Sequence, residues 1–493
     1  MKLLDRIEAV GNRLPHPVTL FIAGTVVVIV LAELAVYCNW TVQSPLGETL
    51  NANSLVTSAG IWWLLGHMVE NFIQFPPLGI VLVGMLGIGM AERSGLLPEL
   101  LRYITLHTHR KLLTPAIIFL GIMSSLALDA GYVVLPPIAA ALYLAAGRSP
   151  LAGIAAAFAG VSAGFSANLA ITAIDPLLAG FTQSAATIIA PGYHVAVTAN
   201  WWFMIISTFL LTLAGWWVTA AWVEPRCVNY KMNPVESMYV QKEATSGKEL
   251  VYAGIVFIFI LFLFLACIFI PGAPLYGQGQ HFSRWVEVTV PLLFLLFFIP
   301  GVIYGTRSGS IKNDRDIAVI MGKTFSDLGP YIVLAFFAAQ FIEIFRYSGL
   351  GVMMAITGGQ WLAGLHVASP VLLCSFIILV LSANLFIGSA SAKYAFMAPV
   401  FVPMLMLVGF SPELTQAAYR VGDSVSNVIT PLNPYMVIIL AQVQKYVKDS
   451  GMGTVVTVML PYTVIFTILW TGLLVLWLLL GIPLGPGGVL HFD

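Results

Sequence analysis

The sequence predicts an all-α polytopic membrane protein with nine transmembrane helices, two re-entrant hairpins and inverted-topology repeats that contain broken helices. Three observations support this fold class. Hydrophobic residues make up 59% of the chain and charged residues only 9%, far below the roughly 25% charged residues of soluble domains. Apolar runs of about 20 residues, enough to cross a bilayer, recur along the chain. Some of these runs also contain polar residues and prolines.

The expected elements follow the apolar runs from the N-terminus onward. Residues 1–16 are predicted to form an amphipathic helix on the membrane surface. Two long runs, 151–175 and 411–440, are interrupted by polar residues and are predicted to be broken spans. Seven uninterrupted runs are predicted to be full-length spans: 17–38, 76–93, 199–223, 249–271, 285–305, 328–346 and 455–481.

The regions 112–147 and 369–409 do not fit a single span. Each is apolar but is divided in its middle by a polar or glycine-rich stretch, "LALDAGY" in the first and "LFIGSASAKY" in the second. The halves are too short to cross a bilayer at about 1.5 Å per residue. We therefore expect two re-entrant hairpins, which are tolerated only where protein or a wet cavity surrounds them.

The loop charges predict the orientation of the chain. Loops 94–113, 224–248 and 306–327 contain lysines and arginines, whereas loops 39–60 and 176–198 contain none. The positive-inside rule then puts the N-terminus in the cytoplasm and the C-terminus in the periplasm. With nine spans, the first hairpin opens to the cytoplasm and the second opens outward.

The two irregular regions resemble each other. A shift of 262 positions aligns Tyr132 with Tyr394 and Gly160 with Gly422. We therefore divide the chain into a first half (17–223), a cytoplasmic linker (224–248) and a second half (249–493). Repeats at about 76–223 and 328–481 would be inserted in opposite orientations, which is typical of secondary transporters.

The stretch "RVGDSVSNVITPLNPYMVIIL", from Arg420 to Leu440, is the most polar of the broken spans. Arg420 and Asp423 share a helix face, so they can offset each other's burial. Pro431 and Pro434 predict unwinding after Gly422. The freed carbonyls and the side chains of this stretch would suit a small hard cation. The first half offers a weaker version of the site, in which Asn168 and Asp175 are the notable candidates.

Other polar residues in the apolar regions admit two interpretations each. Asp129 and Lys393 lie at the hairpin tips, where they can belong to the site or simply contact water. Ser391 can be a ligand or a small residue that permits close packing, and Tyr394 can stack on a substrate ring or pack in the core. The Arg420–Asp423 pair can also be purely structural.

Several function classes are disfavoured by the sequence. The net charge is zero, so no nucleic-acid partner is expected. The four cysteines form no CxxC pair, and the sequence contains neither an HExxH motif nor a Walker motif. No cofactor is therefore expected, and a membrane-embedded enzyme or a channel is a weaker alternative to a carrier that operates in membrane lipid.

Two stretches resemble a known family. "RVGDSVSNVITPLNPY" and "LSANLFIGSASAKYAFMAPVFVPML" (381–405) are similar to signatures of the p-aminobenzoyl-glutamate transporter (AbgT) family. The resemblance implies a homodimer in the bacterial inner membrane. It also implies uptake of p-aminobenzoyl-glutamate or export of sulfonamide antimetabolites, driven by Na⁺ or by the proton motive force.

The resemblance also implies roles for individual residues. The family's substrate positions fall on Asp175, Ser391, Tyr394, Arg420, Asp423 and Pro431. Its Na⁺ site falls on Asn384, Gly388, Asp423 and Asn427, with Asp129 and Asn168 as weaker candidates. The alternative within transport is a sodium-coupled dicarboxylate carrier, whose related architecture shares hairpins and broken helices.

Overall fold

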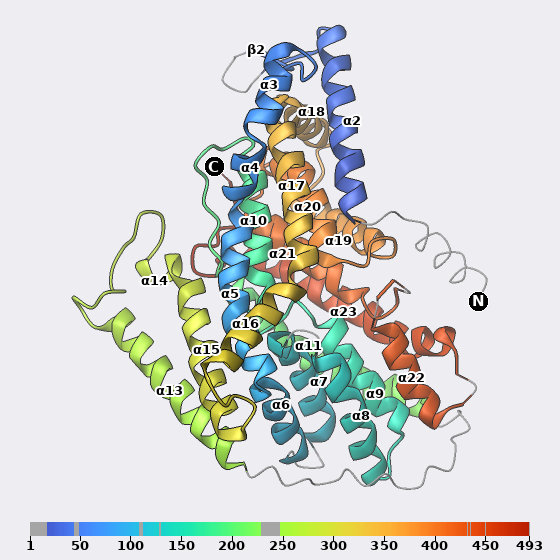
Figure 1. Ribbon diagram of the computed structural model, residues 1–493. Helices are drawn as coiled ribbons and strands as arrows, with labels where there is room; N and C mark the ends of the chain where they lie inside the picture. Colours follow the sequence, from blue (N-terminus) through green and yellow to red (C-terminus); the bar gives the residue numbers. More distant parts are fainter. Residues whose placement is uncertain are drawn as a thin grey trace.

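The computed structural model describes residues 17–43, 49–107, 112–127, 130–227, 247–430, 432–433, 435–448 and 450–492. The predicted surface helix at 1–16, most of the linker, and the candidates Asp129 and Pro431 lie outside these residues. Within them the chain is almost entirely helical (Figure 1). The exception in regular structure is a short antiparallel pair, β1 (Thr41–Gln43) and β2 (Thr49–Asn51).

Seven helical segments are long and apolar enough to cross a membrane, by length and composition, among the residues described. They coincide with the seven predicted full-length spans. They are Val18–Tyr37 in α2 (Pro17–Tyr37), Met68–Arg93 in α4 (Met68–Ile73) and α5 (Pro76–Arg93), Trp201–Cys227 from α11 through η4 (Thr219–Val223) to α12 (Glu224–Cys227), Lys248–Phe269 (α13), Thr289–Ser308 (α15), Gly329–Tyr347 (α17) and Met452–Leu480 (α23). The number of further crossings stays a prediction.

Each region expected to form a hairpin contains two helices separated by a break. The first pair is α7 (Leu113–Met123) and α8 (Ala130–Ala145), with the 3₁₀ turn η2 (Ser124–Ala127) after α7. The second pair is α19 (Ser369–Asn384) and α20 (Ala390–Met406). The Ser389 hydroxyl caps α20 by accepting a hydrogen bond from the Ala392 amide at 3.3 Å.

Both expected broken spans are interrupted helices. In the first half, α9 (Pro150–Phe158) continues into the π-helical turn η3 (Ala159–Ala163) and then unwinds before α10 (Ile174–Ala186). In the second half, α21 (Pro412–Val425) unwinds before α22 (Met436–Tyr446). The unwinding predicted between Gly422 and Pro434 begins after Val425, where helix α21 ends. The helix extends this far because the prolines, at 431 and 434, disfavour helix mainly in the residues that precede them closely.

The two halves contain helices of the same kind in the same order. The order α5, α6 (Leu96–His107), α7, α8, α9, α10, α11 (Trp201–Val218) corresponds to α17, α18 (Leu350–Gly364), α19, α20, α21, α22, α23. The sequence Ser-Pro stands at the beginning of both α9 and α21. In α21 the Ser411 hydroxyl caps the helix by accepting a hydrogen bond from the Leu414 amide at 3.0 Å. This order is what repeats at 76–223 and 328–481 would produce, and their opposite insertion remains a prediction.

Small residues let the first helix pair approach the first broken helix. A Cβ atom on Gly160 would lie 2.4 Å from the Ile118 carbonyl oxygen and 2.9 Å from the Gly121 Cα. Any larger residue would force η3 away from α7, so Gly160 allows the close contact on which the centre of the fold depends.

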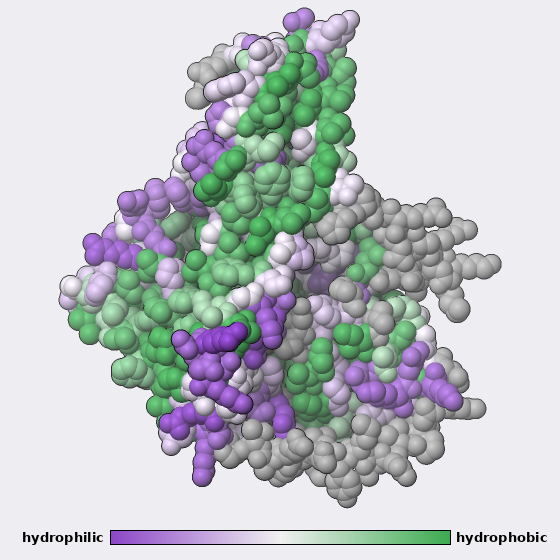
Figure 2. All heavy atoms as spheres, in the orientation of Figure 1, coloured by the Kyte–Doolittle hydropathy of each residue, from purple (hydrophilic) through white to green (hydrophobic). Residues whose placement is uncertain are grey.

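The predicted loop 306–327 is largely helical, which the sequence analysis did not anticipate. Helix α16 (Asp314–Asp327) begins with a capping box, in which the Asn313 side chain accepts the Asp316 amide and the Asp316 carboxylate accepts the Asn313 amide. Figure 2 shows hydrophilic residues gathered around α16 and hydrophobic residues along α2. This contrast is the one expected between an aqueous surface and a lipid-facing surface.

Candidate functional site

A buried ion pair joins the two broken helices. Asp175 lies in the first turn of α10, where its Oδ2 accepts hydrogen bonds from the amide and the hydroxyl of Thr172, at 2.5 Å and 2.8 Å. Its Oδ1 lies 2.7 Å from Nη2 of Arg420 in α21. The Arg420 side chain is 1% exposed, yet its Nε has no hydrogen-bond partner among the described residues. Nη2 is also without a hydrogen bond among the described residues, so its contact with Asp175 is an ion pair only and both nitrogens keep donors available.

A second buried ion pair lies along the same helix. Nζ of Lys393 in α20 lies 2.6 Å from Oδ1 of Asp423, and the two side chains are 0% and 1% exposed. The Lys393 ammonium also donates to Oδ1 of Asn384 at the end of α19. Asp423 Oδ2 is buried without a hydrogen-bond partner among the described residues. The ammonium thus bridges two oxygens and leaves the other carboxylate oxygen free.

These pairs correct two predictions. Arg420 and Asp423 do not offset each other, because Arg420 pairs with α10 and Asp423 pairs with α20. Lys393 does not contact water at a hairpin tip, since its side chain is fully buried and paired. The i, i+3 spacing showed only that two side chains share a helix face, whereas the neighbouring helices decided their partners.

The predicted cation ligands of the second half lie together. The Asn384 amide nitrogen lies 2.8 Å from the Asp423 carbonyl oxygen, 2.9 Å from Ser426 Oγ and 2.8 Å from Asn427 Oδ1. A Cβ atom on Gly388 would meet the Leu432 carbonyl oxygen at 2.6 Å. Gly388 therefore lets the turn between α19 and α20 approach the unwound segment after α21.

Hydrogen bonds between the two halves hold the unwound segments together. The Ser166 amide donates to Ser424 Oγ at 3.3 Å, and the Asn433 amide group donates to Ser162 Oγ at 3.1 Å. The weaker candidate Asn168 donates to Ser125 Oγ at 2.7 Å, which ties its segment to the end of η2. The breaks in both helices consequently form one polar centre.

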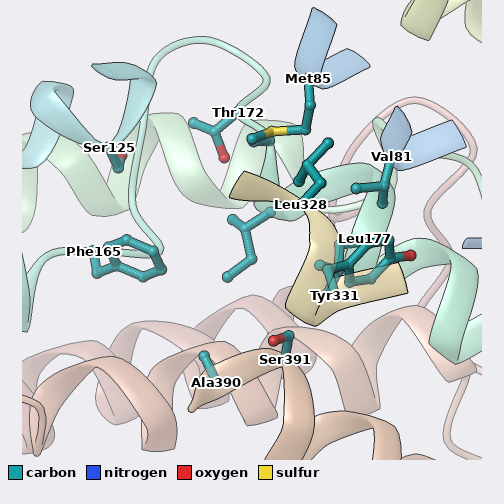
Figure 3. A pocket seen from close by; sticks show the side chains of 12 residues that line it. Val81, Met85, Ser125, Phe165, Thr172, Leu177, Leu328, Tyr331, Ala390 and Ser391 are labelled. Carbon is teal, nitrogen blue, oxygen red and sulfur yellow. The ribbon is translucent and has the colours of Figure 1, made fainter. Parts of the chain in front are cut away.

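A cavity of about 250 Å³ lies beside this centre. Its wall is mostly apolar, and Figure 3 shows Phe165 and Tyr331 on opposite sides with Leu328 between them. Tyr331 Oη is buried and has no hydrogen-bond partner among the described residues. The polar residues of the wall are Ser125, Thr172, Tyr331 and Ser391. The wall contains no charged side chain among the described residues.

Thr172 in the cavity wall contacts one ion pair directly, and Ala390 in the wall is linked to the other ion pair through Tyr419. Thr172 donates to Asp175, the partner of Arg420. The carbonyl of Ala390 lies 2.5 Å from the Tyr419 hydroxyl, which is also 3.2 Å from Asp423 Oδ1. A hydroxyl has one proton and can donate to only one of these acceptors at a time. A ligand in the cavity would therefore be one residue away from Asp175 and two residues away from Asp423.

The structure separates Ser391 from Tyr394, which the family resemblance had grouped as substrate positions. Ser391 lines the cavity. Tyr394 is 1% exposed and does not line it; its hydroxyl hydrogen-bonds to Thr182 at 2.7 Å and its ring packs 4.2 Å from that of Tyr419. The stacking role predicted for Tyr394 is therefore replaced here by core packing.

Sequence reasoning missed Phe165, Tyr331 and the acid partner of Lys393. Tyr331 lies in the first turn of a regular span, α17, so no break or polar cluster in the sequence indicated it. Phe165 lies in the unwound segment after η3, and its place as an aromatic residue beside a predicted break was a signal that could have identified it.

Comparisons with known proteins agree with this geometry. A model of the family described as "AbgT putative transporter family" matches residues 2–492. The chain belongs to the AbgT family. This AbgT chain is 34% identical over 500 residues to the p-aminobenzoyl-glutamate transport protein of Escherichia coli K12, covering 99% of this chain and 96% of that protein.

Two solved structures resemble the AbgT chain over nearly its whole length. The YdaH transporter of Alcanivorax borkumensis, described as having an unusual topology, is 41% identical with a TM-score of 0.91, over 96% of this chain and 100% of that one. MtrF of Neisseria gonorrhoeae, described as illuminating a class of antimetabolite efflux pumps, is 43% identical with a TM-score of 0.89, over 99% and 100%. The AbgT chain is thus a multi-pass membrane transporter and not an enzyme.

Proposed function

We propose that this AbgT protein is an ion-coupled secondary transporter of small aromatic organic anions and antimetabolites. Its substrates would be p-aminobenzoyl-glutamate or sulfonamide-like compounds, carried across the bacterial inner membrane by alternating access. The observation that carries the proposal is the cavity whose wall is linked to Asp175 through Thr172 and to Asp423 through Ala390 and Tyr419. The names of its relatives support the substrate class.

The shape and chemistry of the cavity favour an aromatic substrate. Its volume of about 250 Å³ is near the lower end of small-molecule sites, which begin at roughly 300 Å³. An aromatic ring can pack between Phe165 and Tyr331, since aromatic pairs gain about 0.5–1.5 kcal/mol beyond area burial. The free Tyr331 hydroxyl and Ser391 offer hydrogen bonds to a polar substituent on the ring.

The guanidinium of Arg420 supports recognition of an anionic end. Its Nη2 lies 2.7 Å from Asp175 Oδ1 without a hydrogen bond, and Nε is buried without a partner among the described residues. A buried donor on a cation that has no acceptor raises the free energy of the folded protein. A carboxylate or sulfonyl oxygen of the substrate would accept a charge-assisted hydrogen bond from it. The aromatic residues Phe165 and Tyr331 of the wall favour an aromatic substrate over the alternative aliphatic dicarboxylate, which has no ring to pack against them.

Asp423 supports ion coupling. It is a buried carboxylate at the end of a broken helix, within the set of oxygens formed by Asn384, Ser426 and Asn427. Protonation or cation exchange at such a group changes the local charge by one unit, and this change can bias the unwound segments between two arrangements. The coupling site is therefore proposed at Asp423, next to the cavity.

The decisive experiment is flux in proteoliposomes. Labelled p-aminobenzoyl-glutamate and a labelled sulfonamide would each be tested under an imposed pH gradient and, separately, an imposed Na⁺ gradient. We expect flux that follows one gradient and is competed by the other compound. Flux of succinate but of neither aromatic compound would overturn the proposed substrate class.

A cavity-blocking variant tests whether the cavity is the site. Ser391→Phe would fill part of the cavity, and it should reduce flux at least tenfold. The matched control is Ser375→Phe, which places the same ring on an exposed serine of α19. Equal flux in both variants would remove the cavity from the transport path.

We further propose a homodimer with the N-terminus in the cytoplasm and the C-terminus in the periplasm. Cys38 tests the orientation, because it is exposed directly after α2 and would lie on the periplasmic side of the membrane. A membrane-impermeant maleimide added to intact cells should label Cys38, and the label should be lost in Cys38→Ser. Labelling only after cell lysis would reverse the proposed topology. Light scattering in detergent measures the oligomeric state directly.

A further inference from the structure

A second cavity, of about 520 Å³, is lined by three of the helices that also line the central cavity at Phe165 and Tyr331. These helices are α5, α10 and α17. On α10, Leu177 lines the central cavity and Ser184 lines the second one, about 10 Å further along at 1.5 Å per residue. The volume lies within the roughly 300–1,000 Å³ of small-molecule sites. The proposed topology puts this outer cavity, at Ser184 and Arg346, toward the periplasm, because α10 and α17 run outward to it.

Helix α4 and its two caps form a polar face in the wall of the outer cavity. Four side chains line the wall at the helical spacing i, i+3, i+4 and i+7: His67, Glu70, Asn71 and Gln74. The other residues of α4 are apolar, and Val69 and Ile73 are 67% and 68% exposed, as lipid-facing residues are. An ionisable group in such an apolar segment is unfavourable unless it faces protein, water or a ligand. The polar face of α4 therefore indicates a functional site.

His67 contributes a hydrogen-bond acceptor to this face. Its Nδ1 lies 3.0 Å from the carbonyl oxygen of Trp63, and a carbonyl can only accept, so Nδ1 carries the ring proton. Nε2 of the neutral ring is then an acceptor without a protein partner among the described residues. The ring is held in place because it stacks on Trp63 at 5.2 Å, and Trp63 stacks on Tyr347 at 4.1 Å.

The two amide side chains of the polar face also keep an acceptor each. Gln74 Nε2 donates to Glu70 Oε1 at 2.9 Å, which leaves Gln74 Oε1 without a donor among the described residues. The Gln340 amide nitrogen donates to the Met68 carbonyl at 2.8 Å, so Gln340 Oε1 accepts from Asn71 Nδ2 at 3.2 Å. Asn71 Oδ1 therefore remains as a second amide acceptor.

The rest of the polar wall has the same character. The hydroxyls of Ser184 and Thr187 each donate to a backbone carbonyl at 2.9 Å, so their oxygens can only accept from a ligand. Glu343 lies 2.5 Å from Arg346 and balances its charge, whereas Glu70 pairs with no cation in the part of the chain that the structure describes. The outer cavity is consequently rich in acceptors and carries one excess negative charge.

We propose that the outer cavity is a second binding site, which takes small aromatic compounds through an N–H donor such as an aromatic amino group. The inference rests on the proposed transport of aromatic compounds and adds a second site to its path. The acceptors around Glu70 bind the amino group, and Trp63 and Phe75 in the wall pack against the ring. The central cavity has the opposite preference, because the free donors of Arg420 favour an anionic end. The two cavities therefore recognise opposite ends of one p-aminobenzoyl compound.

Protection of a cysteine in purified full-length protein tests the outer cavity. The background replaces the three cysteines that are not buried, in Cys38→Ser, Cys267→Ser and Cys374→Ser. Thr187→Cys then places one thiol in the wall of the outer cavity, and its alkylation by a maleimide is timed. Near ten times its Kd, p-aminobenzoyl-glutamate should slow alkylation about tenfold, as the unliganded fraction falls. Benzoyl-glutamate, which lacks the amino donor, should leave the rate nearly unchanged at the same concentration.

Two controls show whether the protection is local. The native Cys38, restored alone in this background, is exposed after α2, and neither compound should change its alkylation. Ser391→Phe fills part of the central cavity, so protection of Thr187→Cys should persist when the two substitutions are combined. Loss of protection there would show that a ligand in the central cavity acts from a distance, and would overturn the outer site. Equal protection by benzoyl-glutamate would overturn recognition through the amino group.

Equilibrium dialysis of the wild type decides the question even where Thr187→Cys does not fold. Two molecules of labelled p-aminobenzoyl-glutamate should bind per chain, and one of them should bind benzoyl-glutamate only weakly in competition. One molecule per chain would overturn the outer site.

Flux in proteoliposomes separates this inference from the proposed function. Flux of p-aminobenzoyl-glutamate with one bound molecule and no protection would leave the carrier function intact and overturn the outer site. Protection of Thr187→Cys without flux of any aromatic compound would overturn the proposed function and support the outer cavity as a binding site.

Discussion

Nη2 of Arg420 lies 2.7 Å from Oδ1 of Asp175, and the two residues belong to broken helices in different halves of the chain. Both side chains are buried, so moving α10 away from α21 would leave two unpaired charges in a poorly hydrated setting. The ion pair therefore resists separation of the two helices. Asp175 also accepts from Thr172 in the cavity wall. A substrate that engages the free Nε of Arg420 would therefore act directly on the contact between the halves.

Arg420→Lys should lower apparent substrate affinity at least tenfold while the protein still folds. A lysine can retain the ion pair with Asp175, but its point charge cannot also supply the planar second donor of the guanidinium. The measurement is KM for p-aminobenzoyl-glutamate in proteoliposomes. Arg148→Lys, at the pair with Glu224, is the control and should leave KM unchanged. An unchanged KM in Arg420→Lys would show that Arg420 serves only as a structural partner.

Asp423→Asn should abolish coupled flux and also lower the melting temperature. The substitution leaves the Lys393 ammonium buried without an acid, and removing one partner of a buried ion pair costs about 3–5 kcal/mol. The double variant Asp423→Asn/Lys393→Met removes both charges and should recover most of the stability but none of the coupled flux. Coupled flux at the wild-type rate in the double variant would contradict the assignment of the coupling site.

Gly388→Ala should impair transport by a steric effect. The added Cβ would lie 2.6 Å from the Leu432 carbonyl oxygen, a backbone atom that cannot rotate aside. The turn between α19 and α20 must then move away from the unwound segment. Gly364→Ala is the control, since nothing lies within 4 Å of a Cβ there and alanine is favoured at helical positions. Comparable flux in the two variants would argue against the close approach at Gly388.

Tyr331→Phe should change substrate selectivity without loss of stability. The hydroxyl has no protein partner among the described residues, so its removal leaves no donor or acceptor unsatisfied. Affinity should fall by up to tenfold for compounds whose polar ring substituent reaches this hydroxyl, and should not fall for analogues without the substituent. Tyr462→Phe, which breaks a 2.6 Å hydrogen bond to Thr219 outside the cavity, should instead reduce stability and keep selectivity.

The sequence predicted most of the fold of this AbgT protein. The seven full-length spans were predictable because apolar length alone decides whether a helix can cross a bilayer. The breaks in the four interrupted apolar regions were also predictable, since polar residues, glycines and prolines mark them directly. Helix α16 was missed because its segment is charged and contains no apolar run. Asn313 and Asp316, at the spacing of a capping box, were the signal in the sequence that indicated a helix start.

The residues of the polar centre were visible in the sequence, but their partners were not. A buried Arg420, Asp423 or Lys393 must find an opposite charge, and the sequence therefore determined that ion pairs would form. Which pairs formed depended on the helices beside α21: α10 carries Asp175 on one side, and α20 carries Lys393 on the other. The cavity at Tyr331 arose in the same way, from contacts between distant segments. Local sequence thus determined the helices and their breaks, whereas only tertiary packing decided which charges met, because opposite charges pair by proximity in space and not along the chain.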